Sequence, residues 1–103
     1  MKNNIDNNKF EIELLSLISK YISEEIDPNL NKNINLETRL FGGEGLLDSM
    51  DLVVLLVKIE EFLEENYNIS ITLASEKAMS RRTSPFVRVK YLLEYIFELV
   101  DEK

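Results

Sequence analysis

Apolar residues in the first quarter of the chain recur every three or four positions. The pattern runs from Phe10 to Ile26, which predicts an amphipathic helix. Asp27-Pro28 should end this helix, because the residue before a proline is pushed out of helical geometry. The positions that carry the period are Phe10, Leu14, Leu17, Ile18, Tyr21 and Ile22.

A second helix is predicted from about Ser49 to Glu65. Residues 50–57, MDLVVLLV, would also suit a buried strand. The continuation KIEEFLEEN keeps a helical spacing, with acids between its apolar residues, so one helix explains more of the sequence. The first half of this helix is apolar nearly all round. We therefore expect protein to cover that half on several sides, or a cavity to lie beside it.

The last helix has the most regular apolar spacing. Ser84 suits its N-cap and Pro85 its first turn, where the missing amide hydrogen does no harm, and the period ends near Asp101. Its apolar face consists of Val89, Leu92, Leu93, Ile96, Phe97 and Val100.

The connections between these helices are not featureless. The stretch between the first two helices is too apolar for a free linker, so we expect an ordered loop that lies across the core. Its three glycines, Gly42, Gly43 and Gly45, indicate a sharp change of chain direction just before Asp48. Residues 69–73 alternate apolar with polar and should pack as an extended segment. Ser75 suits the cap of a helix of one or two turns formed by the residues that follow it, EKAMS.

These elements predict an all-α fold. We expect a bundle of three principal helices plus one short helix, with a long loop between the first and second helices. Residues 1–9 are polar and show no apolar period, so they read as a flexible leader ahead of a single domain over 10–101.

Composition narrows the possible chemistry. The 103 residues include no cysteine and no histidine, which removes thiolate chemistry and the side chain most used for proton transfer near neutral pH. The net charge of −7 argues against nucleic-acid binding. The chain has no apolar run long enough to cross a bilayer and no secretory signal, so we expect no membrane insertion and a cytoplasmic location.

The charge is unevenly distributed along the chain. Seven acidic residues and one lysine give residues 44–65 a net charge of −6, whereas five basic residues and one acid give residues 75–90 a net charge of +4. Two interpretations stay open. These regions are either solvated faces that attract each other weakly, or surfaces that dock a partner.

Ser49 is the candidate for chemistry. It is predicted at the start of the second helix, directly after Asp48, where free backbone amides and the helix dipole favour an anion by roughly 0.3 to 1 kcal/mol. Taken by itself, Asp48-Ser49 is far more typical of an ordinary N-cap than of an attachment site. A phosphate-binding nucleotide loop is disfavoured, because Gly-Lys-Ser or Gly-Lys-Thr does not follow the glycines.

The order of elements together with the segment LLDSMDLV resembles the acyl carrier protein family over roughly residues 10–100. Ser49 falls on that family's attachment serine, Asp48 on the acid before it, and Met50 on a position that is usually leucine. Leu40-Phe41 and the segment IEEF at 59–62 extend the similarity.

The resemblance implies a carrier and not an enzyme. A phosphopantetheinyl transferase would move 4'-phosphopantetheine from coenzyme A to Ser49, with Asp48 helping to present the serine. A ligase would then load an acyl or aminoacyl group on the thiol of the arm, and a transferase or synthase would use it. The resemblance also favours a monomer.

The resemblance further implies that the second helix docks partners. An acid is common in the family at the position of Val54, and the third-helix region is usually acidic, whereas this chain has Arg81 and Arg82 there. These departures point to a specialised pathway and not to housekeeping fatty acid synthesis. The candidate docking residues are Asp51, Val53, Val54, Val57, Arg81 and Arg82; Leu52, Leu56, Val53 and Val57 also suit ordinary core packing.

Two other functions compete with the carrier. The first is a helical interaction module with the same fold but no arm, which would use the apolar half of the second helix. The second is a small serine hydrolase, which is disfavoured because no histidine can activate Ser49 and Lys58 lies more than two turns away. Surface attachment to a membrane is disfavoured by the acidic polar faces of the helices.

Overall fold

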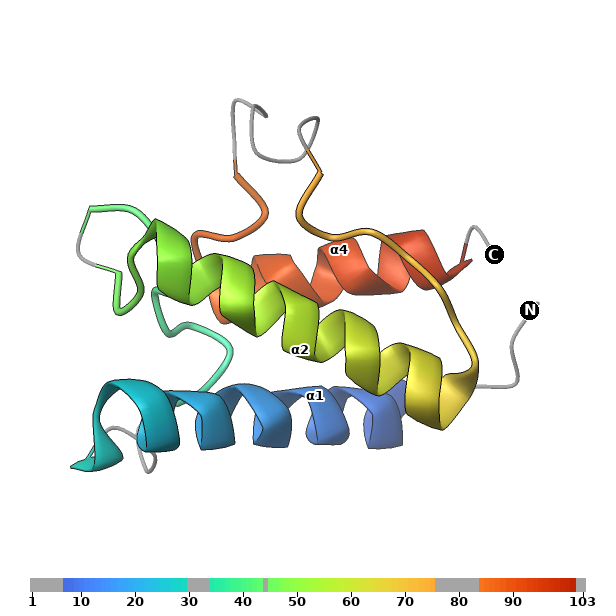
Figure 1. Cartoon of the computed structure of the whole chain (residues 1–103), viewed down its shortest axis with the longest axis horizontal. Coiled ribbons are helices and arrows are strands. Elements are labelled where there is room, and N and C mark those ends of the chain that lie inside the picture. Colours follow the sequence, from blue (N-terminus) through green and yellow to red (C-terminus); the bar gives the residue numbers. More distant parts are fainter. Residues whose placement is uncertain (1–6, 30–33, 44, 76–83, 102–103) are drawn as a thin grey trace.

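The computed structural model describes residues 7–29, 34–43, 45–75 and 84–101 (Figure 1). In this part of the chain the fold is all-α and contains no β-strand beyond two isolated bridges. Helix α1 spans Asn7–Tyr21 and continues as a wider π-helical turn, η1, over Ile22–Ile26. Helix α2 spans Ser49–Tyr67, and helix α4 spans Val89–Asp101.

The first helix ends where the sequence predicted. Asp27 is extended, and its N–H donates to the Ile22 carbonyl at 2.8 Å, which closes the wide turn before Pro28. The predicted leader over 1–9 is wrong for its last three residues, because α1 already begins at Asn7. Residues 7–9 form an exposed polar turn, and a turn without core contacts leaves no trace in an apolar period. Residues 1–6 lie outside the described residues.

The start of the last helix was also predicted wrongly. Ser84 is not its N-cap: the Ser84 hydroxyl accepts the Phe86 N–H in a turn, and α4 begins at Val89. The chain first pairs with the loop between α1 and α2, where the Leu40 N–H donates to the Val87 carbonyl at 2.7 Å. The Val89 and Lys90 amides at the start of α4 then donate to loop carbonyls, so the loop caps the helix.

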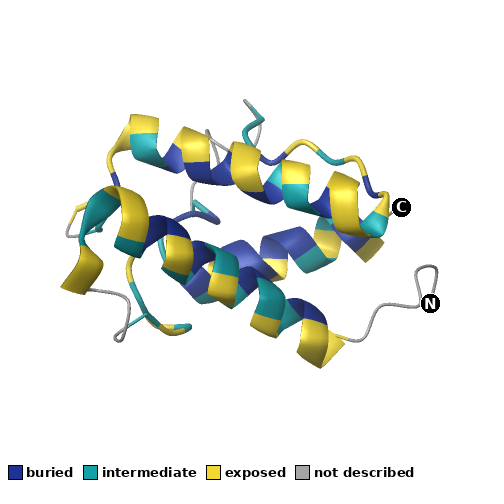
Figure 2. Cartoon of the chain, turned by 60° about the horizontal axis from the view of Figure 1, so that its bottom comes forward, coloured by how far each residue is buried: buried dark blue, intermediate teal, exposed yellow. Residues whose placement is uncertain are grey.

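One apolar core lies between the three helices (Figure 2). The Phe10 ring of α1 meets the Tyr67 ring of α2 edge-on at 5.1 Å and the Phe97 ring of α4 at 5.3 Å, so this cluster joins all three helices. The loop contributes Leu40 and Leu47, both buried, which confirms that it lies across the core. No polar or charged side chain of the described residues is buried.

The segment after α2 behaves as predicted. Asn68 takes a left-handed conformation, with φ of 55°, and ends the helix two residues beyond the predicted Glu65. Ile69 and Leu73 are then buried in an extended stretch. Ser75, the predicted cap of a short helix, is itself not helical, as expected of a cap residue, and the residues of that predicted helix lie outside the described residues.

Candidate functional site at the start of helix α2

Ser49 is the first residue of α2, and it is exposed. Asp48 is the N-cap: its Oδ1 accepts the Asp51 N–H at 2.8 Å, and Oδ2 of Asp51 accepts the Asp48 N–H at 3.5 Å. This reciprocal capping box fixes the backbone on both sides of Ser49. The serine is therefore presented on an ordered helix end, with its side chain open to solvent.

The first backbone N–H groups of α2 lie next to Ser49, and only some of them have a hydrogen-bond acceptor within the described chain. Asp48 satisfies the Asp51 amide, and its carbonyl accepts the Leu52 N–H at 2.9 Å. The Ser49 and Met50 amides have no acceptor among the described residues, and the Ser49 hydroxyl has no described partner either. A phosphate ester on Ser49 would thus lie beside two free N–H groups at the positive end of the helix dipole.

The glycine-rich turn explains how the chain reaches this helix end. Gly42 has φ of 88°, a backbone conformation that residues with a side chain rarely adopt. Gly45 is required for a different reason: a Cβ there would lie 2.7 Å from the carbonyl carbon of Leu40 and from the Phe41 nitrogen. The turn folds back closely enough for the Leu47 N–H to donate to the Leu40 carbonyl at 2.7 Å, two residues before Ser49.

Tyr21 joins the end of α1 to the start of α2. Its hydroxyl donates to the Asp51 carbonyl at 3.0 Å while its ring is buried. Burial raises the pKa of Tyr21 above its ordinary value, and the negative charges of Asp51, Glu25 and Asp48 raise it further. The sequence indicated Tyr21 only as a core position. Its hydroxyl contact spans 30 residues and leaves no local signal in the sequence.

The apolar first half of α2 has two different faces. Leu52 and Leu56 are fully buried, whereas Val53 and Val57 are each 41% exposed. The prediction that protein covers this half on several sides is therefore wrong for its outer face within the described chain. Four apolar side chains lie open on that face: Met50 at 78% exposure, Val53, Val54 at 46%, and Val57.

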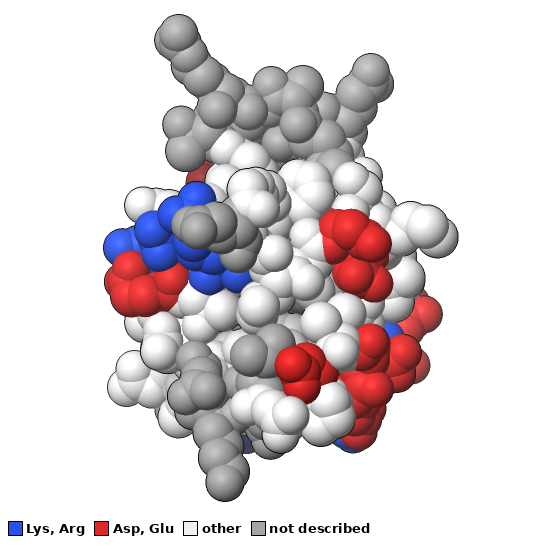
Figure 3. Space-filling view, turned by 90° about the vertical axis from the view of Figure 1, so that its left-hand side faces the viewer, with Lys and Arg blue, Asp and Glu red and all other residues white. Residues whose placement is uncertain are grey.

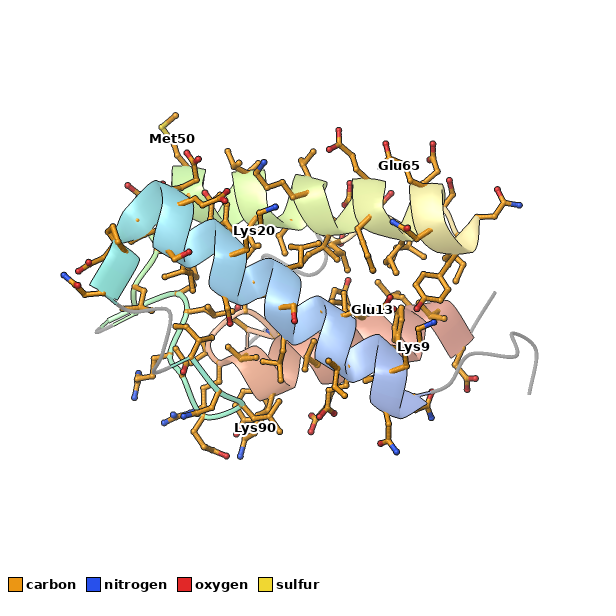
Figure 4. The ribbon with its side chains drawn as sticks, turned by 90° about the horizontal axis from the view of Figure 1, so that it is seen from below. Lys9, Glu13, Lys20, Met50, Glu65 and Lys90 are labelled. Carbon is orange, nitrogen blue, oxygen red and sulfur yellow. The ribbon has the colours of Figure 1, made fainter. Side chains whose placement is uncertain are left out.

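These four residues, which we call the α2 apolar stripe, lie within two turns of Ser49. Their spacing of three, four and seven positions from Met50 places them on one side of the helix. Figure 4 shows Met50 pointing away from the bundle at the start of α2. An exposed apolar stripe of this kind is typical of a contact surface for another macromolecule.

The second half of α2 borders two grooves lined by carboxylates. One, of about 310 Å³, lies between α2 and the segment after it, and the other, of about 280 Å³, lies between α1 and α2. Glu61 and Glu65 line both grooves. The described residues contain no group of three or more side chains arranged to hold a metal ion.

The predicted site residues separate into three groups. Ser49, Asp48, Met50 and Asp51 come together at the start of α2, where Asp51 serves the capping box and is half-buried. Val53, Val54 and Val57 share the exposed face that begins beside them. Arg81 and Arg82 lie outside the described residues.

Comparison with known proteins does not assign the chain. No family model, no curated protein and no solved structure matches it. Of the helices in the described ranges, none combines the length and the apolar character needed to cross a membrane.

Proposed function

We propose that this chain is an acyl or aminoacyl carrier protein, which holds its cargo as a thioester on a 4'-phosphopantetheine arm attached to Ser49. The observation that carries the proposal is the position of Ser49. It is exposed as the first residue of a helix, follows the N-cap Asp48, and stands in the segment LLDSMDLV. The order of the helices and the long loop between α1 and α2 support the same assignment.

The surroundings of Ser49 fit the arm that the proposal requires. The phosphodiester is an anion, and the two unpaired amides of Ser49 and Met50 favour an anion at this place. Ser49 is exposed, so a transferase can reach it without unfolding the chain. The bound arm supplies the thiol that carries the cargo, which is why a chain without cysteine can do this chemistry.

The α2 apolar stripe is the proposed contact surface for the partners of the carrier. Those partners are the phosphopantetheinyl transferase, the ligase that loads an acyl or aminoacyl group, and the enzyme that uses it. Val54 contributes an apolar side chain where a fatty-acid-type carrier commonly has an acid. Partners of this chain therefore recognise the middle of the stripe by apolar contact, which favours a dedicated pathway over the general fatty acid synthase.

Intact mass spectrometry tests the proposal directly. The protein is incubated with coenzyme A, Mg²⁺ and a broad-specificity phosphopantetheinyl transferase, with Ser49→Ala treated in parallel. We expect the parent to gain one phosphopantetheine and the variant none. If the folded parent gains no mass with several transferases, the carrier function is refuted.

A helical interaction module without an arm is the second candidate. The α2 apolar stripe favours it, because four exposed apolar residues need a partner whether or not Ser49 is modified. This candidate predicts binding of a partner that Ser49→Ala leaves unchanged and Val54→Glu weakens. If the chain is a carrier, the amount of cargo-loaded protein should instead depend on both Ser49 and Val54.

A further inference from the structure

A basic patch lies at the end of the molecule that bears Ser49, opposite the acids at the start of α2. It consists of Arg39 in the loop together with Arg88 and Lys90 at the start of α4, and we call it the loop–α4 basic patch. Figure 3, which looks at this end, shows Lys and Arg side chains gathered on one side with acidic atoms directly beside them, and further acids on the other side. A cationic patch stands out in a chain whose net charge is −7.

The backbone places the two arginines side by side. Arg39 and Arg88 are directly opposite each other in an isolated antiparallel bridge, so their Cβ atoms are about 5 Å apart. Like charges in directly opposite positions are destabilising. The fold therefore brings the side chains of two cationic residues to the same side of one backbone bridge, where their charges repel.

Neighbouring groups neutralise the patch only in part. The Nη1 of Arg88 donates to the Glu37 carbonyl at 2.7 Å, and the Glu37 carboxylate pairs with the Lys90 ammonium at 3.3 Å. Among the described residues, no carboxylate forms an ion pair with Arg39 or Arg88. One acid against three cations leaves an excess of two positive charges that face solvent.

The location of the patch indicates which partner meets it. The Arg39 carbonyl accepts the Leu46 N–H at 3.3 Å, three residues before Ser49. In this modification the Ser49 oxygen bonds to the phosphorus of phosphopantetheine, the pyrophosphate bond of coenzyme A breaks, the adenosine bisphosphate half leaves, and a base of the transferase takes the hydroxyl proton. The transferase must therefore contact the helix end itself, and a specific interface covers about 800 Å² on each side. The two shorter extents of the whole molecule are only 29 and 21 Å, so a footprint of this size centred on Ser49 reaches the patch as well.

We infer that the loop–α4 basic patch docks carboxylates on the surface of the transferase that modifies Ser49. This inference rests on the proposed function and adds a second contact to it, on the opposite side of Ser49 from the α2 acids. Arginine favours carboxylates as partners, because one guanidinium group can bind a carboxylate through two parallel hydrogen bonds. The contact orients the carrier, because a partner that matches the basic and the acidic side can approach in one direction only.

The test compares rates of modification between two double variants with the same change of charge. Arg39→Glu with Arg88→Glu reverses the patch, and Lys20→Glu with Lys58→Glu reverses two lysines of the groove between α1 and α2. We expect the arginine variant to lower kcat/KM for modification roughly tenfold at low salt. This difference should shrink in about 0.5 M salt, because salt screens interactions between exposed charges. The lysine variant should change it less than about twofold.

A single variant protects the test against loss of structure. Arg88 also holds Glu37, so its replacement can loosen the loop, whereas Arg39 is exposed and its single replacement leaves that hydrogen bond in place. Arg39→Glu alone should lower kcat/KM roughly threefold at low salt. Equal rates for parent and variants, or an equal loss in the lysine variant, would overturn this inference alone. A parent that is never modified would overturn it together with the proposed function.

Discussion

Asp48 has a structural role that can be separated from a role in modification. Its carboxylate caps α2, so Asp48→Ala should lower the free energy of unfolding by about 1 kcal/mol. Serine is also a good cap, so Asp48→Ser should stay within about 0.5 kcal/mol of the parent in urea denaturation. If Asp48 presents Ser49 to the transferase, both variants are modified more slowly. Modification of Asp48→Ser at the parental rate would contradict that role.

Tyr21 makes stability depend on pH in the alkaline range. Burial, followed by the charges of Asp51, Glu25 and Asp48, raises its pKa above 10.0, so the folded state holds the phenolic proton more tightly than the unfolded state. The stabilisation is therefore complete below pH 10 and is lost as the pH rises through the folded-state pKa. The difference in unfolding free energy between the parent and Tyr21→Phe should fall above pH 10. A difference that grows there would refute the assignment.

Gly45 sets the tightness of the turn before α2. In Gly45→Ala the new Cβ meets backbone atoms of Leu40 and Phe41, which cannot move as a flexible side chain can, so we expect a loss of about 1 to 3 kcal/mol. Gly42→Ala is the matched variant: its φ is positive, but no atom lies within 4 Å of the new Cβ. Thermal unfolding should show the larger loss for Gly45→Ala, and the reverse order would contradict the close approach.

Helix α2 buries one face and exposes the other, and adjacent residues distinguish the two. Val54 is 46% exposed, so Val54→Glu should change the free energy of unfolding by less than about 0.5 kcal/mol. Leu55 is fully buried, so Leu55→Ala should cost about 2 to 5 kcal/mol. Urea titrations of both variants check this. A large loss in Val54→Glu would mean that the stripe is part of the core.

The helices could be predicted because their apolar periods record burial against the core. For a uniformly apolar helix, the sequence does not predict which face is buried. Val53 and Leu52 are chemically alike, and only packing against α1 and α4 decides which of them is buried. The start of α4 was misplaced for a similar reason. Its first amides donate to loop carbonyls about 50 residues earlier in the chain. A local motif such as Ser84-Pro85 cannot reveal partners that lie so far away in the sequence.

The bundle as a whole brings together groups that the sequence keeps apart. The position of Ser49 could be predicted from the local segment LLDSMDLV. The structure has Ser49 as the first residue of α2, as that segment predicted. The loop–α4 basic patch was recognisable only in part. Arg88 and Lys90 lie in the basic stretch over 75–90, whereas Arg39 lies 49 positions before Arg88 and joins it only through the pairing of the loop with the start of α4. Long-range pairing of this kind is the part of a site that one sequence does not reveal.

Site-resolved mass spectrometry shows whether phosphopantetheine becomes attached to Ser49. The protein is treated with coenzyme A, Mg²⁺ and transferase, digested, and sequenced by fragmentation, with Ser49→Ala and Ser16→Ala alongside; Ser16 is an exposed serine within α1. The account predicts one arm on the peptide that contains Ser49, in the parent and in Ser16→Ala, and none in Ser49→Ala. An unmodified parent, or an arm that persists in Ser49→Ala, would contradict it.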